Sequence, residues 1–218
     1  MTKILITSGP TRQYLDPVRY LTNASSGRMG CALAEAALEL GHEVWVISGP
    51  VAIGYPAAAR RIDVDTTSDM LREVMTLFPQ VDGLIGAAAP CDYMPMHVSP
   101  HKIAKSGEPL ELRLIETPDV VAAAAATKQA HQWVIGFALE TEDQRFRAMV
   151  KMQRKFCDMM VSNDASAINS DNNSVEILGH QGTLLANVAG TKTEVARAIL
   201  ATAEKHLIQG RRKKPSSL

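Results

Sequence analysis

The sequence predicts an α/β fold built on a mostly parallel sheet. Short apolar runs alternate with segments of helical periodicity along nearly the whole chain, which is typical of βαβ units. Several of these runs are apolar at almost every position, as expected of strands that are covered on both faces. Polar or glycine-containing loops follow some of the runs, and such loops usually form the binding edge of a parallel sheet.

The expected strands are short and rich in β-branched and other apolar residues. Residues 110–115 alternate apolar and polar side chains, which predicts one exposed face, and a turn at Gln181-Gly182 predicts a hairpin. In chain order the expected strands are 3–8, 43–48, 61–64, 83–89, 110–115, 134–138, 159–162 and, as that hairpin, 175–186.

Helices are expected between these strands, and their ends carry recognisable signals. Gly41 stands where a helix C-terminal glycine belongs, and Thr117-Pro118 offers a cap and a first-turn proline. The segment 191–194 has the pattern of a capping box. The expected helices are 29–40, 68–78 with caps among residues 66–68, an alanine-rich helix after Pro118, a basic amphipathic helix over 144–156, and a last helix from 191 to about 208.

The composition excludes several classes of protein. The 218 residues include 23 Lys+Arg and 23 Asp+Glu, so the chain lacks the long-range attraction of a nucleic-acid or anionic-membrane binder. Three scattered cysteines without a Cys-x-x-Cys pair indicate neither a disulfide framework nor a zinc site. His97 and His101 are separated by Pro100 and have no fourth ligand, so no metal site is predicted.

The two ends of the chain add further expectations. The N-terminal apolar run is too short for a signal peptide or a membrane span, which favours a cytoplasmic protein with no membrane association. Residues 210–218 form a basic end rich in Pro and Ser, and we expect this tail to be disordered.

A long loop after strand 3–8 is the first candidate site. Gly9 follows the strand, but the group Ser25-Ser26-Gly27 comes more than a dozen residues later, before a helix that contains Gly30. In a dinucleotide-binding fingerprint the glycines follow the strand directly. Hydroxyls, backbone N–H groups and a positive helix end in this group suit a phosphate. A capped helix that packs a glycine on the sheet fits the same residues, and both interpretations remain open.

The segment after strand 83–89 is the second candidate. Small residues at Ala88 and Ala89 let a ligand approach the backbone, and Asp92 follows within reach. The stretch of about 94–108, with Lys102 and Lys105, fits a flap that brings positive charge onto a polyphosphate, or alternatively a solvated loop.

Two later strands also end in candidate residues. Phe137 is suited to stacking on a nucleobase or to packing in the core. Asn163 has the groups to bond a base or ribose, or to cap a turn. The residues alone leave these alternatives open.

Short motifs recur in a fixed order along the chain, and this order is more specific than any one motif. They are Gly9-Pro10-Thr11, Asp16-Pro17-Val18-Arg19, the run 22–30, Ser48-Gly49-Pro50, Ala88-Ala89 with Asp92-Tyr93, Lys102-Ile103, Gly136-Phe137 with Glu140-Thr141, Asn163-Asp164 and the run 169–173. From about Ile4 through the last helix, the chain resembles phosphopantothenoylcysteine synthetase, the ligase of coenzyme A biosynthesis. It looks like a free-standing synthetase or an excised ligase domain, and no flavin is implied.

The resemblance implies a Rossmann-like, three-layer α/β/α domain over residues 1–209 with a mostly parallel mixed sheet. It also implies a two-step ligation. The carboxylate of 4'-phosphopantothenate attacks the α-phosphate of CTP, or of ATP in the eukaryotic branch, and pyrophosphate leaves. The amine of L-cysteine then attacks the acyl carbon and releases the nucleoside monophosphate. Mg²⁺ would shield the triphosphate. A homodimer is implied, because in this family the partner completes the site.

Carried over to this sequence, the resemblance implies roles for individual residues. Lys102 on the flap would stabilise charge in the first step, Asn23 would hold the pantothenoyl portion and the acyl intermediate, and Arg19 would assist the second step. The nucleotide would contact Gly9, Ser25, Ser26, Gly27, Gly30, Asp92, Phe137 and Asn163. Phosphopantothenate would contact Asn23, Ala88, Ala89 and Asp92.

Three positions depart from the family pattern. Ala104 replaces a lysine of the flap, Met94 stands where bacterial members commonly have arginine, and Leu139 replaces a small residue near Phe137. These changes bear on nucleotide preference and affinity. The segments around the helix entry and Gly136-Phe137 look bacterial, which favours CTP over ATP.

Two alternative functions were weighed. A nicotinamide-dependent reductase would need a lysine four residues after a tyrosine, and none of the four tyrosines has one. The acidic ribose anchor expected after strand 43–48 is also absent. A catalytically silent nucleotide-binding module would need neither Lys102 nor Asn23.

Overall fold

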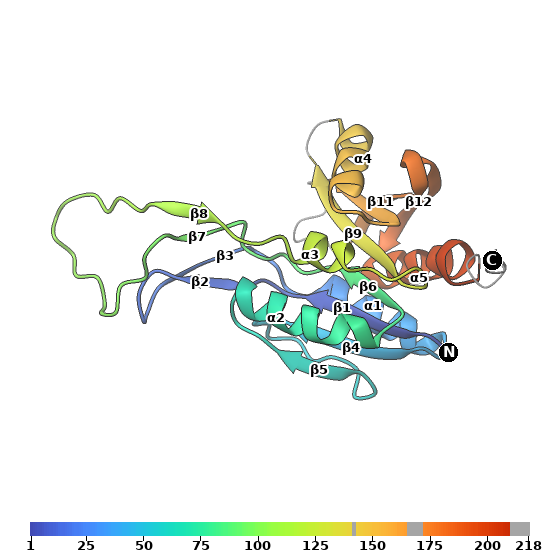
Figure 1. The fold of residues 1–218 in the computed structure, drawn as a ribbon, viewed down its shortest axis with the longest axis horizontal. Coiled ribbons are helices and arrows are strands. Elements are labelled where there is room, and N and C mark those ends of the chain that lie inside the picture. Colours follow the sequence, from blue (N-terminus) through green and yellow to red (C-terminus); the bar gives the residue numbers. More distant parts are fainter. Residues whose placement is uncertain (141–142, 165–171, 210–218) are drawn as a thin grey trace.

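A single large sheet organises the molecule (Figure 1). A computed structural model describes residues 1–140, 143–164 and 172–209. Within them the eight-stranded sheet has the order β12-β11-β10-β9-β6-β1-β4-β5. Its strands are β1 (Lys3–Ser8), β4 (Glu43–Ser48), β5 (Arg60–Asp63), β6 (Gly83–Gly86), β9 (Trp133–Glu140), β10 (Met159–Asp164), β11 (Asn172–Leu178) and β12 (Leu184–Thr191). The strands from β10 to β5 pair in parallel, whereas β11 and β12 extend the sheet antiparallel.

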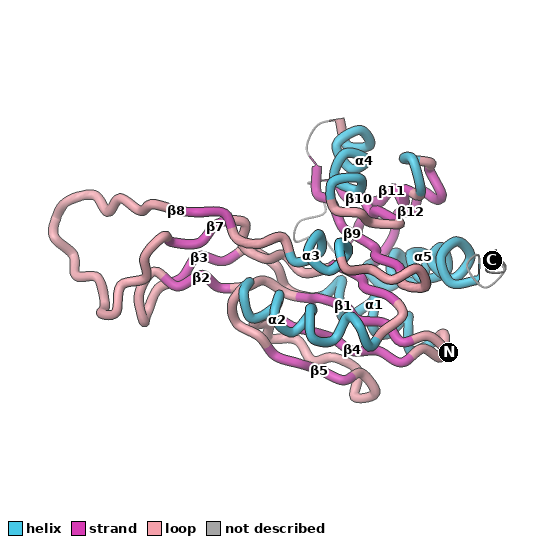
Figure 2. The backbone as a smooth tube through the Cα atoms, in the orientation of Figure 1, coloured by secondary structure: helices cyan, strands magenta, loops and turns pink. Residues whose placement is uncertain are grey.

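Helices cover both faces of this sheet, which confirms the predicted fold class (Figure 2). One face packs against α1 (Arg28–Glu39) and α5 (Lys192–Ala203), and α5 continues as a π-helical turn, η4 (Glu204–Ile208). The other face packs against α2 (Thr67–Leu77), α3 (Val120–Ala126) and α4 (Gln144–Arg154). Short 3₁₀ turns span η1 (Phe78–Gln80) and η3 (His180–Gly182).

The two-residue period of the strands divides the core between these faces. In β1, Ile4 and Ile6 pack with α1 and α5, whereas Leu5 between them packs with Met70 and Val74 of α2. Burying all three apolar side chains of one strand in this way requires helices on both sides of the sheet. No helix in the described part of the chain is both long and apolar enough to span a bilayer.

The structure corrects several expected element boundaries. Helix α3 is capped by Asp119, whose side chain accepts a hydrogen bond from the backbone N–H of Ala122, and not by Thr117. Thr117 instead donates its hydroxyl to the carbonyl of Cys91. Strand β6 ends at Gly86 and β8 spans only Leu114–Glu116. The capping box at Thr191 and the Gln181-Gly182 turn are confirmed. The expected tail, 210–218, lies outside the described residues.

Two short β-ribbons form an arm that extends away from the sheet, and of their strands the sequence predicted only one, 110–115, which overlaps β8 (Figure 1). We define the arm as residues 12–22 and 93–116. In the first ribbon β2 (Arg12–Tyr14) pairs antiparallel with β3 (Tyr20–Thr22), and in the second β7 (Tyr93–Pro95) pairs with β8. The expected flap, about 94–108, is therefore part of a larger projecting element.

The buried carboxylate of Asp16 ties the two ribbons together. It accepts backbone N–H bonds from Val18 and Arg19 in its own ribbon and from Ile103 in the other. Arg19 donates its guanidinium to the carbonyl of Ile103 at 2.8 Å. Burial alone would raise the pKa of the Asp16 carboxyl, but these N–H bonds and the Arg19 charge outweigh it and hold the pKa below its ordinary value.

Replacing Asp16 by Asn should loosen the arm without unfolding the sheet. We expect hydrogen exchange in residues 96–113 to rise about tenfold at pH 7, because the amide is a weaker acceptor for three N–H groups. Since the pKa of Asp16 is lowered on folding, its contribution is present above the ordinary value of 3.8 and is lost as the pH falls through the lowered pKa. Hydrogen-exchange mass spectrometry measures both the increase at pH 7 and its pH dependence. The Asp63→Asn variant, at an exposed carboxylate, is the control. Equal exchange in the two variants would refute this anchoring role.

Gly30 allows α1 to lie close to β1. A Cβ atom at this position would be 2.0 Å from the Ser8 hydroxyl oxygen and 2.4 Å from its Cβ. We expect Gly30→Ala to destabilise the fold by about 1–3 kcal/mol through overpacking. Chemical denaturation measures this loss, with Gly54→Ala as the control because a Cβ there would meet nothing within 4 Å. A matching free energy of unfolding for both variants would contradict the packing argument.

Candidate functional site

The carboxyl edge of the sheet is where the chain reverses its winding direction, because β4 lies on one side of β1 and β6 lies on the other. Beyond the strands the two loops remain in contact. The backbone N–H of Ala89 donates to the carbonyl of Gly9 at 2.9 Å, and Pro10 and Ala89 form an isolated parallel bridge. Gly9 has a φ of +73° and lies against Val51, so it shapes this junction.

A hollow of about 200 Å³, here called the α1 hollow, opens where α1 begins. It brings together most residues of the first predicted phosphate group with Ala89 and Asn163. Gly27, with a φ of +74°, is the helix N-cap and provides no side-chain cap. The lining residues are Ala24, Ser25, Ser26, Gly27, Arg28, Met29, Gly30, Ala87, Ala89, Leu139, Asn163, Asn173 and Lys192.

The α1 hollow has the chemistry of an anion site. Its lining includes the cations Arg28 and Lys192, and no carboxylate occurs among the described residues that line it. The ammonium of Lys192 donates to Oδ1 of buried Asn173 at 3.0 Å. The side-chain oxygen of Asn163 is buried and has no hydrogen-bond partner among the described residues, so it is available to a ligand donor.

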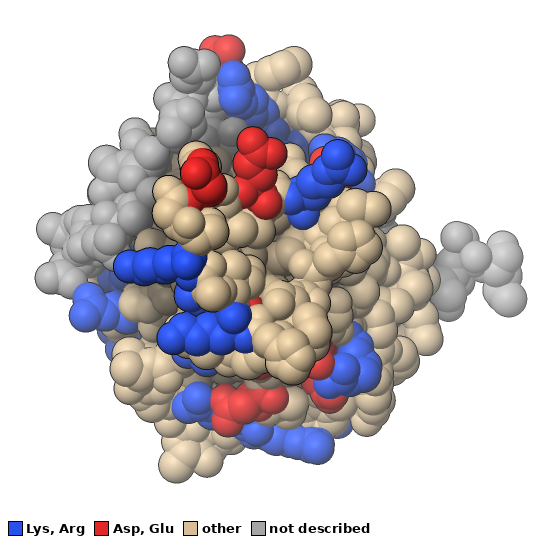
Figure 3. Space-filling view, turned by 90° about the vertical axis from the view of Figure 1, so that its left-hand side faces the viewer, with Lys and Arg blue, Asp and Glu red and all other residues tan. Residues whose placement is uncertain are grey.

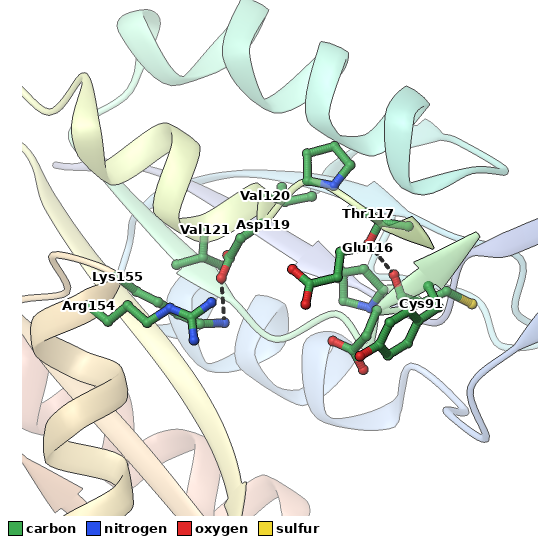
Figure 4. Close-up of a pocket in the computed structure, with 12 residues that line it drawn as sticks. Cys91, Glu116, Thr117, Asp119, Val120, Val121, Arg154 and Lys155 are labelled. Carbon is green, nitrogen blue, oxygen red and sulfur yellow. Dashed lines mark hydrogen bonds and ion pairs between the residues drawn. The ribbon is translucent and has the colours of Figure 1, made fainter. Parts of the chain in front are cut away.

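A second hollow, of about 360 Å³, lies beside the start of α3 and is called the α3 hollow (Figure 4). Lys155 from the end of α4 pairs with Asp119 at 3.1 Å, and Arg154 stands next to it. The backbone N–H of Thr117 donates to the carbonyl of Asp92 at 2.9 Å. The lining residues are 90–93, 116–121, Arg154 and Lys155.

Charges of both signs line the α3 hollow. Asp92, Glu116 and Asp119 contribute carboxylates, and Arg154 and Lys155 contribute cations. Carboxylates would repel a polyphosphate but accept hydrogen bonds from amino or hydroxyl groups. This hollow is therefore better suited to a nucleoside than to its phosphates.

Asn23 lies at the junction between the two hollows. Its amide nitrogen donates to the carbonyl of Ala89 at 3.3 Å and to that of Pro90 at 2.9 Å. Ala89 lines the α1 hollow, and Pro90 lines the α3 hollow. Asn23 itself is not among the lining residues of either hollow, but it bonds to one residue of each.

The predicted catalytic residues of the arm do not reach this junction within one chain. Arg19 is bonded to Ile103, and the exposed Lys102 precedes Ile103 in the segment that extends away from the sheet (Figure 1). Ala104 is exposed on the same segment, and Met94 is half-buried in β7. Arg19 and Lys102 are thus neighbours of each other but not of Asn23.

Besides Asn23, three predicted contact residues do not line either hollow. Half-buried Phe137 packs against the core that β9 shares with α1 and α5. Ala88 packs against the core under α2 and α3, and Gly9 shapes the loop junction. None of the three is among the lining residues of either hollow.

Two thiols, Cys91 in the α3 hollow and Cys157 after α4, have raised pKa values. Burial raises the pKa of the Cys91 thiol, which donates to the carbonyl of Thr11. Burial also raises the pKa of Cys157 to about 12. Neither cysteine has the lowered pKa of an activated nucleophile. Among the described residues, no group of three or more His, Cys, Asp and Glu side chains is placed to hold a metal ion.

Sequence reasoning missed several residues that line the hollows, namely Arg154, Lys155, Lys192 and the stretch 116–121, whereas Asn173 was named only as part of the motif 169–173. The basic character of the α4 segment is visible in the sequence, but its pairing with Asp119 is a contact between distant positions. Lys192 is visible only as a capping-box residue.

Comparison with known proteins identifies the family. The family model of the DNA/pantothenate metabolism flavoprotein C-terminal domain matches residues 1–207. The coenzyme A biosynthesis bifunctional protein CoaBC of Escherichia coli K12 is 41% identical over 186 residues, covering 82% of this chain and 46% of that protein. The Bacillus subtilis 168 protein of the same name is 39% identical over 184 residues, which cover 82% of this chain and 45% of that protein. The chain therefore spans about half the length of these curated relatives.

Solved structures show the same fold. The C-terminal domain of CoaBC superimposes with a TM-score of 0.82 at 37% identity, covering 95% of this chain and 96% of that one. A Cab2 mutant in complex with phosphopantothenate-cysteine superimposes with a TM-score of 0.77, covering 96% and 89%, and its 14% identity shows the fold alone. By sequence and by fold, the chain belongs to the family of the DNA/pantothenate metabolism flavoprotein C-terminal domain.

Proposed function

We propose that this chain is a phosphopantothenate–cysteine ligase that uses a nucleoside triphosphate. The carboxylate of 4'-phosphopantothenate attacks the α-phosphorus, and the bond to the β-phosphate breaks to release pyrophosphate. The amine of L-cysteine then attacks the acyl carbon, loses a proton and displaces the nucleoside monophosphate. Membership of a family whose relatives are named for coenzyme A biosynthesis supports this proposal. The observation that carries it is the pair of chemically different hollows, lined by the adjacent residues Ala89 and Pro90, to whose carbonyls Asn23 donates.

The charges of the hollows orient the nucleotide. Its triphosphate lies in the α1 hollow, against Ser25, Ser26, Gly27 and two cations. Its base lies in the α3 hollow, where the carboxylates accept from an exocyclic amino group. Asn163 lines the α1 hollow, and its buried amide oxygen accepts a hydrogen bond from a nucleotide donor there. The α-phosphate then lies near Asn23, where the carboxylate of phosphopantothenate reaches it.

Chemistry of this kind needs positioning and charge neutralisation more than a protein nucleophile. The raised thiol pKa values agree with that requirement. Mg²⁺ would neutralise the triphosphate, because phosphate oxygens are ligands that this ion prefers. We place the reaction in the cytoplasm and favour CTP over ATP as the co-substrate, as the sequence predicts.

The arm supports a homodimer. Large apolar side chains are exposed along it, and a patch of this kind usually marks an interface. They are Val18, Tyr20, Tyr93, Met96, Val98, Leu110, Leu112, Leu114 and Ile115. Seen along the arm, charges of both signs are interspersed with broad uncharged surface (Figure 3). We propose that the arm packs on a second copy and brings Lys102 and Arg19 to the partner's Asn23 junction.

The first test is pyrophosphate release by the purified chain with Mg²⁺ and 4'-phosphopantothenate, comparing CTP with ATP, each with and without cysteine. We expect release that depends on phosphopantothenate and amide product only when cysteine is added. A folded chain that binds nucleotide but releases no pyrophosphate would favour the catalytically silent module. Hydride transfer from a nicotinamide cofactor would favour the reductase.

A second test mixes two inactive variants, Asn23→Ala and Lys102→Ala. Each alone should lose about 100-fold or more in rate, because one binds the acyl group and the other stabilises charge. After subunit exchange, half of the dimers are mixed and each holds one intact site, so about a quarter of the wild-type rate should return. Lys205→Ala, on an exposed side chain outside both hollows, is the control and should keep full activity. No recovery in demonstrably mixed dimers would place both residues in the same chain's site.

A further inference from the structure

Two helices begin at the α1 hollow, and each starts with a cation. Arg28 is the first residue of α1 and Lys192 the first residue of α5, and both side chains line the hollow. A positive charge in the first turn opposes the helix dipole, which favours anions at that end. Two helix N-termini and two cations at one hollow are favourable for a phosphate site.

The position of Lys192 is fixed from two sides. The capping box holds the start of α5, because Thr191 accepts from the N–H of Glu194 while the Glu194 carboxylate accepts from Thr191. The Glu194 carboxylate is thereby engaged at the helix cap. The ammonium of Lys192 donates to Asn173, which is 5% exposed and lies on β11 opposite Gly190. This bond holds the long side chain at the hollow.

We infer that Lys192 binds the terminal phosphates of the nucleoside triphosphate and then the departing pyrophosphate. This inference rests on the proposed function and deepens it by assigning a residue that neither the motifs nor the family resemblance singled out. Lys192 comes from the antiparallel end of the sheet, whereas Ser25 and Gly27 come from the loop after β1. The two groups hold the triphosphate from opposite sides, with the α-phosphate toward Asn23.

The test compares triphosphate with monophosphate binding. We expect Lys192→Met to weaken the binding of triphosphate about tenfold or more and the binding of monophosphate less than about twofold. The reason is that only the triphosphate reaches the Lys192 ammonium. Titration calorimetry with CTP and CMP, and with ATP and AMP, measures this ratio. Inhibition by inorganic pyrophosphate should weaken in parallel. Lys192→Arg keeps the charge and should stay within about threefold of wild type.

Lys205→Met is the matched control, since it removes an exposed lysine roughly 20 Å further along the same helical segment. Unchanged triphosphate affinity in Lys192→Met, with wild-type pyrophosphate release intact, overturns this assignment and leaves the proposed function standing. Equal weakening of triphosphate and monophosphate binding, together with a lower melting temperature of the variant, also overturns the assignment. Lys192 would then stabilise the fold through Asn173 and would not bind phosphate. A wild-type chain that binds neither triphosphate overturns both proposals.

Discussion

Hydrogen bonds between the loops after β1 and β6 hold the site together. The carbonyls of Thr7 and Gly9 accept from the N–H groups of Ala87 and Ala89, which continues the parallel pairing beyond the last strand residues. Asn23 then bonds to the carbonyls of Ala89 and Pro90. Because the two hollows lie on either side of this junction, its backbone geometry sets the distance between them. A displacement of even 1 Å in such a junction would lower the rate of a reaction that depends on the alignment of its groups.

Electrostatics gives the two hollows different tasks. The described lining of the α1 hollow has two cations and no carboxylate, whereas the α3 hollow has three carboxylates and two cations. In the proposed ligase, a triphosphate would be attracted to the first hollow and repelled by the carboxylates of the second, which would give the nucleotide one favoured direction. The chain as a whole has zero net charge, which means that the asymmetry is local.

The sequence was sufficient to predict the sheet and the helices, because their signals are local. The run 3–8 and the capping box at Thr191 became elements with the expected boundaries. The arm was missed because its ribbons depend on Asp16 contacting Ile103, 87 positions away. The predicted phosphate group at Ser25 and Gly27 does line a hollow, but Lys192 reaches the same hollow from the far end of the chain. Lys192 reaches the α1 hollow because β11 and β12 extend the sheet on that side. No local sequence pattern indicates this long-range pairing.

The arm also holds Arg19 and Lys102, the two residues proposed to supply charge to the reaction, next to each other. Arg19 donates to the carbonyl of Ile103, the residue that follows Lys102, and Asp16 accepts from the N–H of the same residue. The two ribbons are therefore joined next to Lys102, and a displacement of one carries the other. In the proposed ligase, whichever site receives Lys102 for the first step would also receive Arg19 for the second. Asn23 is bonded to the carbonyls of Ala89 and Pro90 beside the sheet, so the proposed site would combine a fixed half with an arm that supplies positive charge.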